Sequence, residues 1–402
     1  MGKIVPELAK PAPRNLCTDC GLSRMKIAKS CGQACQFIQP DYPAMEHKIH
    51  GRQRGDDDEL FFGPFTAMHR AVLRKAEPGA QWTGLTTKLA ETALRSGHVD
   101  AVLCVGPDPK DRWKPQPVII TDADDMAEMR GMRMGYAPVL ALLEEAARLG
   151  YRRLALIGIP CQVYALRAIE AKLGLERLYV IGTPCSDNTT TENFHEFLAR
   201  LSDRPDEISY LEFRADYHVE LRFDDGHQQL IPFLKLPLAD LPNDFFPTTC
   251  RTCVDYTNVL ADITVGYMAG TGEQWVIIRN SRGQELLDSL GDLVRLSPLA
   301  DRGRRKGPVT GFLENTRRAA GGLPLRRMPG FMRGVMGWLM PRIGPKGLEF
   351  ARARVEMKAI ETVLHLRRTH AARMKAMVPD HVWSLVARYG LTPRPEERNS
   401  DQ

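Results

Sequence analysis

Short apolar runs alternate with amphipathic helical patterns through the middle of the chain. The runs that predict buried strands are residues 101–105, 153–158 and 178–181, and the patterns with helical period are residues 86–95, 138–149, 162–173 and 191–201. Strands that are separated by helices pair in parallel and are covered on both faces. The pattern therefore predicts an α/β fold with a largely parallel sheet and flanking helices.

The other segments add an insert and a helical end to this fold. Residues 208–236 alternate between apolar and polar positions, which predicts an antiparallel insert. The polar segment 41–80 predicts a solvated connection. The remaining predicted elements are strands at 263–267 and 275–278 and helices at 283–290, 348–377 and 381–389. These features divide the chain into three parts, residues 1–80, 81–300 and 301–402.

The composition is that of an ordinary globular protein. Of 402 residues, 43% are hydrophobic and 26% are charged, and the net charge of +6 does not argue for nucleic acid. No apolar run approaches the roughly 18 residues that suggest a membrane span. The N-terminus lacks the apolar core of a signal peptide. We expect a cytoplasmic protein whose nine cysteines are metal ligands and buried thiols rather than disulfides.

Eight of the cysteines can form two sets of four. The first set is Cys17, Cys20, Cys31 and Cys35, and the second set is Cys161, Cys185, Cys250 and Cys253. Four thiolates suit a 4Fe–4S cluster or a zinc ion, and the spacing alone does not choose between them. Cys104 lies inside a predicted strand, where we expect a buried and inert thiol.

The second set comes from distant parts of the chain. Cys161 and Cys185 each follow a predicted strand, so both belong at the carboxyl edge of the sheet, where ligands of such sheets bind. Cys250 and Cys253 precede the strand at 263–267. A site assembled in this way is more typical of a redox cluster beside a cofactor than of structural zinc, so iron–sulfur is the favoured interpretation.

Other nucleotide and catalytic motifs are missing from the sequence. It contains no Walker A motif, no Gly-x-Gly-x-x-Gly between a strand and a helix, no His-Glu-x-x-His and no Gly-x-Ser-x-Gly. The short stretch 269–272, Ala-Gly-Thr-Gly, predicts a turn.

The segment 302–346 has an unusual charge. It contains eleven Lys and Arg residues and one acidic residue, Glu314, and its stretch 328–340 is apolar, flexible and rich in methionine. Three interpretations stay open. The segment is a solvated, partly disordered chain, a docking surface for an acidic protein or a membrane, or a lid over an apolar substrate.

Six stretches resemble the family named for the beta subunit of deazaflavin-coenzyme-reducing hydrogenase, and specifically its chlorophyll-pathway branch. The stretches are residues 81–84, 105–112, 159–166, 178–188, 250–268 and 344–352. The Pro-Cys-Gln at 160–162 identifies only the broad family. The Cys-x-x-Cys block that begins at Cys250 and the Gly-Pro-Lys-Gly-Leu-Glu-Phe block at 344–350 are more specific to the branch.

The resemblance implies FAD and two 4Fe–4S clusters held by the two cysteine sets. The FAD contacts that it implies are Gln81, Trp82, Thr83, Gly84, Gln162, Asn188 and Asn258. Residues 1–80 then form an iron–sulfur domain with a linker, 81–300 the flavin-binding domain with the second cluster, and 301–402 the basic segment and C-terminal helices. Relatives usually carry a third cysteine where this chain has Ser23, so we expect Cys31 to supply that ligand.

The branch also implies an activity. It contains the ferredoxin-dependent 8-vinyl reductase of divinyl (proto)chlorophyllide and the plant 7-hydroxymethyl chlorophyll a reductase. We expect an oxidoreductase that converts the 8-vinyl group to ethyl in (bacterio)chlorophyll biosynthesis. A flavin accepts single electrons from ferredoxin and delivers them as a pair. The candidate proton donors are Asp255, Tyr256 and Asp187, with a structural role as the alternative for each, and the residues expected to cover the pigment are Phe331, Met336 and Trp338.

Three alternative functions stay open. One is 7-hydroxymethyl chlorophyll a reduction, against which the absence of a transit-type N-terminus argues. The others are an electron-transfer subunit of a hydrogenase or dehydrogenase and a zinc-stabilised module that binds nucleic acid. The expected partners are reduced ferredoxin and a chlorophyllide-type tetrapyrrole, without nucleic acid. Peripheral contact with a photosynthetic membrane and self-association stay open.

Overall fold

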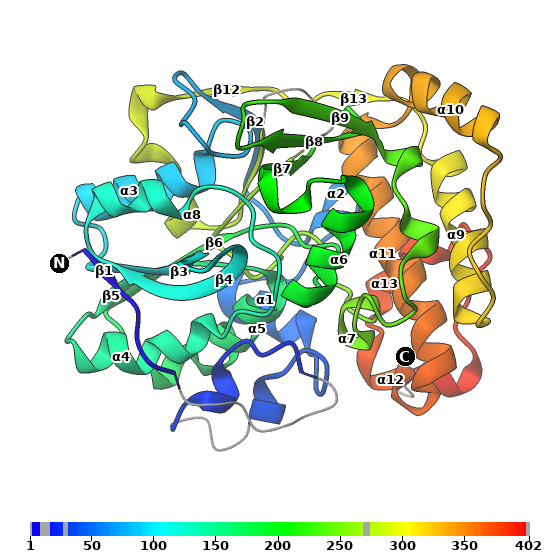
Figure 1. Ribbon diagram of the computed structural model, residues 1–402. Coiled ribbons are helices and arrows are strands. Elements are labelled where there is room, and N and C mark those ends of the chain that lie inside the picture. Colours follow the sequence, from blue (N-terminus) through cyan, green and yellow to red (C-terminus); the bar gives the residue numbers. More distant parts are fainter. Residues whose placement is uncertain (1, 9–16, 27–30, 215, 268–273, 399–402) are drawn as a thin grey trace.

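A large mixed sheet forms the centre of the computed structural model, which describes residues 2–8, 17–26, 31–214, 216–267 and 274–398 (Figure 1). Among these residues the sheet has nine strands, in the spatial order β1 (Lys3–Ile4), β4 (Asp111–Ile120), β3 (Ala101–Asp108), β5 (Arg153–Gly158), β6 (Arg177–Gly182), β10 (Ile263–Tyr267), β11 (Gln274–Ile278), β2 (Ala67–Leu73) and β12 (Val294–Ser297). β3, β5, β6 and β10 pair in parallel, and the strands on either side pair antiparallel. The α/β prediction is confirmed, with its parallel part at the centre of the sheet.

Helices cover both faces of this sheet. α3 (Leu85–Arg95) and α8 (Ser281–Asp288) pack on one face, and α1 (Tyr42–His50), α4 (Leu142–Arg148) and α5 (Pro160–Ile169) pack on the other. Figure 1 shows the first pair above the sheet and α4 and α5 below it. Burial on both faces explains why the central strands read as continuous apolar runs in the sequence.

The prediction of a solvated connection at 41–80 is wrong. This segment forms α1, α2 (Asp58–Phe62) and β2, and β2 pairs with both β11 and β12. Ala71 and Leu73 of β2 are buried, whereas His69 and Arg70 interrupt the apolar pattern. A strand near the edge of a sheet buries fewer side chains, so its sequence resembles a polar linker.

The antiparallel insert is confirmed. β7 (Ile208–Phe213), β8 (His218–Phe223) and β9 (Gln228–Pro232) form a separate antiparallel sheet, and α6 (Thr191–Leu201) shares its apolar core. The stretch 269–272 lies outside the described residues.

The C-terminal region is helical, as predicted from residue 348 onward, and it also contains two helices within 302–346 that were not predicted. It contains α9 (Lys306–Ala320), α10 (Gly330–Ile343), α11 (Leu348–Thr369), α12 (Met374–Met377) and α13 (Asp380–Ala387), and the short strands β13 (Asp301–Arg302) and β14 (Lys346–Gly347) join its start to the base of α11. The stretch 328–340, expected to be flexible, lies mostly in α10. No helix in the described ranges has the length and apolar character needed to cross a bilayer.

A buried carboxylate fixes the centre of the sheet to α5. Asp262, next to the start of β10, accepts hydrogen bonds from Arg167 Nη2 at 2.8 Å and from the backbone N–H of Val180 at 2.7 Å. Arg282 Nε and Asn280 Nδ2 donate to the same carboxylate at 2.9 and 2.8 Å. Burial alone would raise the pKa of Asp262, but the charges of Arg167 and Arg282 hold it below its usual range. The residue is therefore ionised and links β6, β10 and two helices.

We expect Asp262→Asn to lower the free energy of unfolding by about 3–5 kcal/mol at neutral pH, because it leaves the Arg167 guanidinium buried without its counter-charge. Urea denaturation monitored by circular dichroism measures this change. The difference should shrink as the pH falls below about 4, because the carboxylate of the unfolded wild type then takes up a proton more readily than the native carboxylate, whose pKa is lowered.

The matched control is Asp100→Asn, which removes the half-exposed ion pair with Arg153. Such pairs contribute only about 0–1 kcal/mol. Equal losses in the two variants would contradict a special role for the buried carboxylate.

Candidate functional site

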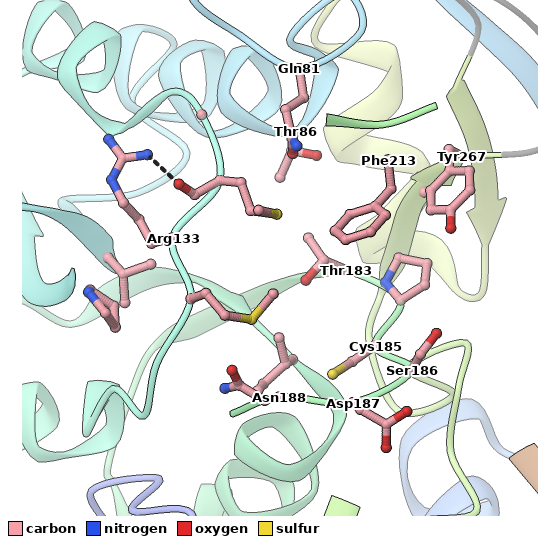
Figure 2. Close-up of a pocket in the computed structure, with 18 of the residues that line it drawn as sticks. Gln81, Thr86, Arg133, Thr183, Cys185, Ser186, Asp187, Asn188, Phe213 and Tyr267 are labelled. Carbon is pink, nitrogen blue, oxygen red and sulfur yellow. Dashed lines mark hydrogen bonds between the residues drawn. The ribbon is translucent and has the colours of Figure 1, made fainter. Parts of the chain in front are cut away.

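A cavity of about 660 Å³ lies at the carboxyl ends of the parallel strands (Figure 2). Its walls come from the ends of β3, β5, β6 and β10, the start of α3, the loop at 129–137, the loop at 183–189, and residues 233–246 after β9. The volume lies in the range of cofactor and ligand sites. The sequence placed the ligand site at this edge, and the cavity is found there.

A glycine allows one of these loops to approach the sheet closely. A Cβ atom at Gly266 in β10 would lie 2.4 Å from Cγ of Pro184, which is too close for any other residue without a shift. The Thr183-Pro-Cys185 turn therefore lies directly against β10. This contact places Cys185 at the cavity wall.

Five of the seven residues expected to contact FAD line the cavity. They are Gln81, Trp82, Gly84, Gln162 and Asn188. The other two support the wall from behind. The Thr83 hydroxyl donates to Gln274 Oε1 at 3.2 Å and accepts from the Leu73 N–H, and Asn258 Nδ2 donates to the Gly158 carbonyl at 2.8 Å.

The sequence did not identify Arg133 as a site residue. Arg133 lines the cavity, and its Nη1 donates to the Met132 carbonyl at 3.3 Å (Figure 2). The same nitrogen donates to the Arg130 carbonyl at 2.8 Å. Its buried Nε has no hydrogen-bond partner, and no ion pair of Arg133 with a carboxylate is found among the described residues. Burial lowers the pKa of this guanidinium. An unneutralised cation in the wall suits a ligand with an anionic group, such as a phosphate.

The second cysteine set converges beside the cavity, and one of its members, Cys185, lines the cavity. Burial raises the pKa of the Cys161 thiol well above its usual value, and negative charge at Cys185, Cys250 and Cys253 raises it further. Cys161 lies in the first turn of α5, Cys185 follows β6, and Cys250 lies in α7 (Thr248–Arg251). Four thiols from three parts of the chain thus lie close enough to interact electrostatically.

The first cysteine set also converges. Burial raises the pKa of Cys20 to about 12, and the charges of Cys35 and Cys17 add to the effect. Cys31 and Cys17 act in the same way on Cys35. Leu22, Met25 and Ala34 pack into the core beneath α4 and α5, so this segment lies against the α/β fold.

The two sets are neighbours. The Thr18 hydroxyl lies 3.9 Å from Cys161 Sγ, and Gln36 Nε2 donates to Cys253 Sγ at 3.4 Å, so residues beside the first set contact sulfurs of the second. Donors aimed at sulfur favour the thiolate form.

The thiols are spaced too widely for a single ion. Within the described part of the chain, no three His, Cys, Asp or Glu side chains are grouped closely enough to hold one metal ion.

A buried charge cluster lies beside the second set. Lys358 Nζ of α11 contacts Asp187 Oδ1 at 2.7 Å and Glu361 Oε2 at 3.0 Å. Burial raises the pKa of Asp187 to about 6, with a further rise from Glu361, although Lys358 opposes both. Burial would lower the pKa of Lys358, but the two carboxylates raise it. Asp187 lines the cavity (Figure 2), and its ion pair with Lys358 connects the cavity wall to α11.

The other two candidate proton donors differ in position. Tyr256 lines the cavity, and burial raises the pKa of its phenol. Asp255 does not line it, and both of its carboxylate oxygens accept the Val259 N–H at 3.1 and 3.2 Å. This contact gives Asp255 a structural role in the turn before β10.

The residues expected to cover the pigment lie elsewhere. The cavity lining among the described residues does not include Phe331, Met336 or Trp338, which belong to α10. Phe331 and Trp338 are exposed instead. These three side chains therefore do not cover the main cavity in the structure.

Comparison with known proteins identifies two matching family domains. Residues 68–144 match the N-terminal domain, and residues 151–299 the C-terminal domain, of the coenzyme F420 hydrogenase/dehydrogenase beta subunit. The structure resembles a chain of the F420-reducing [NiFe] hydrogenase complex from Methanosarcina barkeri, with a TM-score of 0.53 and 21% identity, over 59% of this chain and 84% of that chain. This likeness concerns the fold.

Two relatives match nearly the whole length. The 7-hydroxymethyl chlorophyll a reductase of Oryza sativa subsp. japonica is 36% identical over 98% of this chain and 87% of that protein. An uncharacterized protein of Nostoc sp. is 35% identical over 96% of both chains. A component of the F(420)H(2) dehydrogenase of Methanosarcina mazei is 29% identical over 54% of this chain and 61% of that protein.

We expect Lys358→Met to destabilise the protein by about 3 kcal/mol or more, because it leaves the Asp187 and Glu361 carboxylates buried without a cation. Thermal unfolding followed by circular dichroism measures the effect. Lys306→Met removes an exposed lysine of α9 and serves as the control, with an expected change within about 0.5 kcal/mol. A Lys358→Met protein as stable as the control would show that this cluster does not depend on its cation.

Proposed function

The chain belongs to the family of coenzyme F420 hydrogenase/dehydrogenase beta subunits, and from this premise we propose that it is an iron–sulfur flavoprotein reductase of a chlorophyll-type pigment. The proposed reaction converts the 8-vinyl group of divinyl (proto)chlorophyllide to ethyl with electrons from reduced ferredoxin. The relative from Oryza sativa, which acts on a chlorophyll derivative by its name, supports the pigment class.

One observation carries the proposal. The cavity and the second cysteine set share a wall, because Cys185 belongs to both. The first set lies next to the second, because Thr18, which follows Cys17, contacts Cys161 of the second set. Electrons that enter at the first set would thus need only short steps between neighbouring groups to arrive at a ligand in the cavity.

The cavity residues fit FAD. Bound FAD would accept electrons singly and deliver them in pairs, which joins a one-electron donor to a two-electron reduction. Arg133 offers a guanidinium without a carboxylate partner for the pyrophosphate. Gln81, Gln162 and Asn188 line the same cavity, and each donates its amide N–H to a backbone carbonyl, so they would hold the wall against which the ring lies. These residues come from three loops and from the first turn of α5, so a ligand that contacts all of them would be held in one orientation.

The reduction also needs two protons. Asp187 and Tyr256 line the cavity, so we propose them as proton donors to the pigment. Lys358 holds the Asp187 carboxylate in place at 2.7 Å. Asp255 is buried beneath the wall and would act by shaping the turn that carries Tyr256.

One apolar part of the cavity wall favours the vinyl group as the reacting group. It belongs to the core cluster shared with the antiparallel insert and consists of Phe194, Phe197, Leu236, Leu241, Phe245 and Phe246. A vinyl group needs no hydrogen-bond partner, whereas a buried hydroxyl without a partner is destabilised by about 1–3 kcal/mol. The proposal of 8-vinyl reduction rests on this difference.

A second candidate is reduction of the 7-hydroxymethyl group to methyl with loss of water. The relative from Oryza sativa favours it through its name and its match over 98% of this chain. Both reactions consume two electrons and two protons, so the same residues would serve either one.

Anaerobic purification followed by a visible spectrum before and after dithionite tests the cofactors. We expect flavin and iron–sulfur bands that bleach on reduction. Incubation with reduced ferredoxin and each pigment, followed by chromatography, then tests the reaction, and we expect the divinyl pigment to gain an 8-ethyl group.

Zinc without iron or flavin would overturn the whole proposal. A vinyl group that persists while hydroxymethyl becomes methyl would replace the first candidate with the second. Tight co-purification with a catalytic partner and no turnover alone would instead indicate an electron-transfer subunit.

We expect Cys161→Ser to lower the iron content by about half, because it removes a ligand of one of two proposed clusters. Iron and acid-labile sulfide assays on anaerobic protein measure this loss. Cys104→Ala is the matched control, since Cys104 is buried in β3 outside both sets and its loss should leave iron unchanged. Full iron content in Cys161→Ser would exclude Cys161 as a ligand.

A further inference from the structure

Helix α10 presents large apolar side chains to solvent. Phe331 is 77% exposed, Trp338 61% and Val335 59%, and no residue of the helix is buried. Figure 1 shows α10 at the outer edge of the molecule, beyond α9 and α11. An exposed apolar surface of this kind marks a place of interaction.

The exposed side chains form one stripe along the helix. Phe331, Val335, Trp338 and Arg342 are spaced by four, three and four positions, so they share a single face. The Arg342 guanidinium lies 4.1 Å from the centre of the Trp338 ring. Met332 and Ile343, which flank the stripe, are exposed as well. A helix with Phe, Trp and aliphatic residues on one face and arginine beside them is typical of the membrane interface.

The charge around the stripe is almost entirely positive. Segment 302–346 contains eleven basic residues and one acidic residue. Arg326, Arg333 and Arg342 have no carboxylate partner in the part of the chain that the structure describes, whereas Arg327 pairs with Asp240. Unpaired arginines beside an exposed apolar stripe complement an anionic surface.

The inner face of α10 closes a second apolar cavity. Gly337 and Met340 line this cavity of about 180 Å³ together with Tyr217 and Phe350. The second cavity shares Phe233 and Arg354 with the main cavity. The cavity beneath the exposed helix therefore adjoins the candidate site through these two side chains.

We propose that α10 docks the protein onto an anionic lipid surface. Phe331, Val335 and Trp338 enter the headgroup region, and the arginines contact lipid phosphates. An acidic protein partner would explain the arginines but not three large apolar side chains in one row. A bilayer can also supply an apolar molecule to the apolar cavity behind the helix, whereas a water-soluble protein partner would not. With the proposed function, which this last point assumes, docking places the site beside a membrane-dissolved pigment.

Vesicle flotation with the full-length protein tests the docking. The vesicles contain phosphatidylcholine alone or phosphatidylcholine with phosphatidylglycerol. We expect the wild type to bind the anionic vesicles roughly tenfold more tightly or better, and Phe331→Glu/Trp338→Glu to lose about tenfold or more of that binding. Arg333→Gln/Arg342→Gln should lose the preference for phosphatidylglycerol.

The matched control is Leu293→Glu/Leu296→Glu, which puts the same charges on exposed leucines near and in β12, and it should float like the wild type. The proposal is overturned if the wild type does not float or if the Phe331→Glu/Trp338→Glu protein floats equally well. It is also overturned if that variant instead loses ferredoxin binding, or changes from an oligomer to a monomer, with vesicle binding intact.

Turnover of a tail-free pigment in solution separates this proposal from the proposed function. Phe331→Glu/Trp338→Glu should turn over such a pigment at the wild-type rate, because neither residue lines the main cavity. A wild-type protein that floats but reduces no pigment would support the docking and contradict the pigment reductase.

Discussion

The candidate site depends on one buried ionised carboxylate. Asp262 is fully buried and accepts hydrogen bonds from Arg167, Arg282, Asn280 and the Val180 N–H. Burying an ion is costly unless its partners are well placed, so this arrangement tolerates only one register of β10 against β6 and one position of α5. The four cysteines of the second set lie on segments next to these elements. Directional ionic contacts thus set the positions of thiols that apolar packing alone would hold less uniquely.

The parts of the fold that the sequence predicted are those with a strong local pattern. β5 and β6 are buried on both faces, and their apolar runs were visible without other information. β2 was missed because it lies next to the edge strand β12 and carries His69 and Arg70. β4 was also missed, since Pro115 and Pro117 interrupt its sequence although it pairs with β3.

The residues of the candidate site also divide into those that the sequence predicted and those that it missed. The thiols of both sets were found because cysteine is rare and its spacing is informative, and the structure brings each set together. Arg133 was missed because no motif surrounds it. Its position in the cavity wall is set by the fold of the loop at 129–137. Asp255 was a candidate proton donor because it lies in a family motif, yet its carboxylate accepts a hydrogen bond from the Val259 N–H. Residue type and spacing reveal ligands, whereas the direction of a side chain requires the fold.

Trp82 illustrates a constraint of another kind. Its backbone is left-handed, with φ of 56°, a conformation that glycine or asparagine adopts more readily. Its indole stacks on Tyr267 at 5.5 Å between ring centres, and it lines the cavity. A smaller residue would relax the backbone but remove the aromatic wall. The position is therefore a compromise in which stability is traded for the shape of the cavity, and substitutions that make this protein more robust should tend to make its cavity less selective.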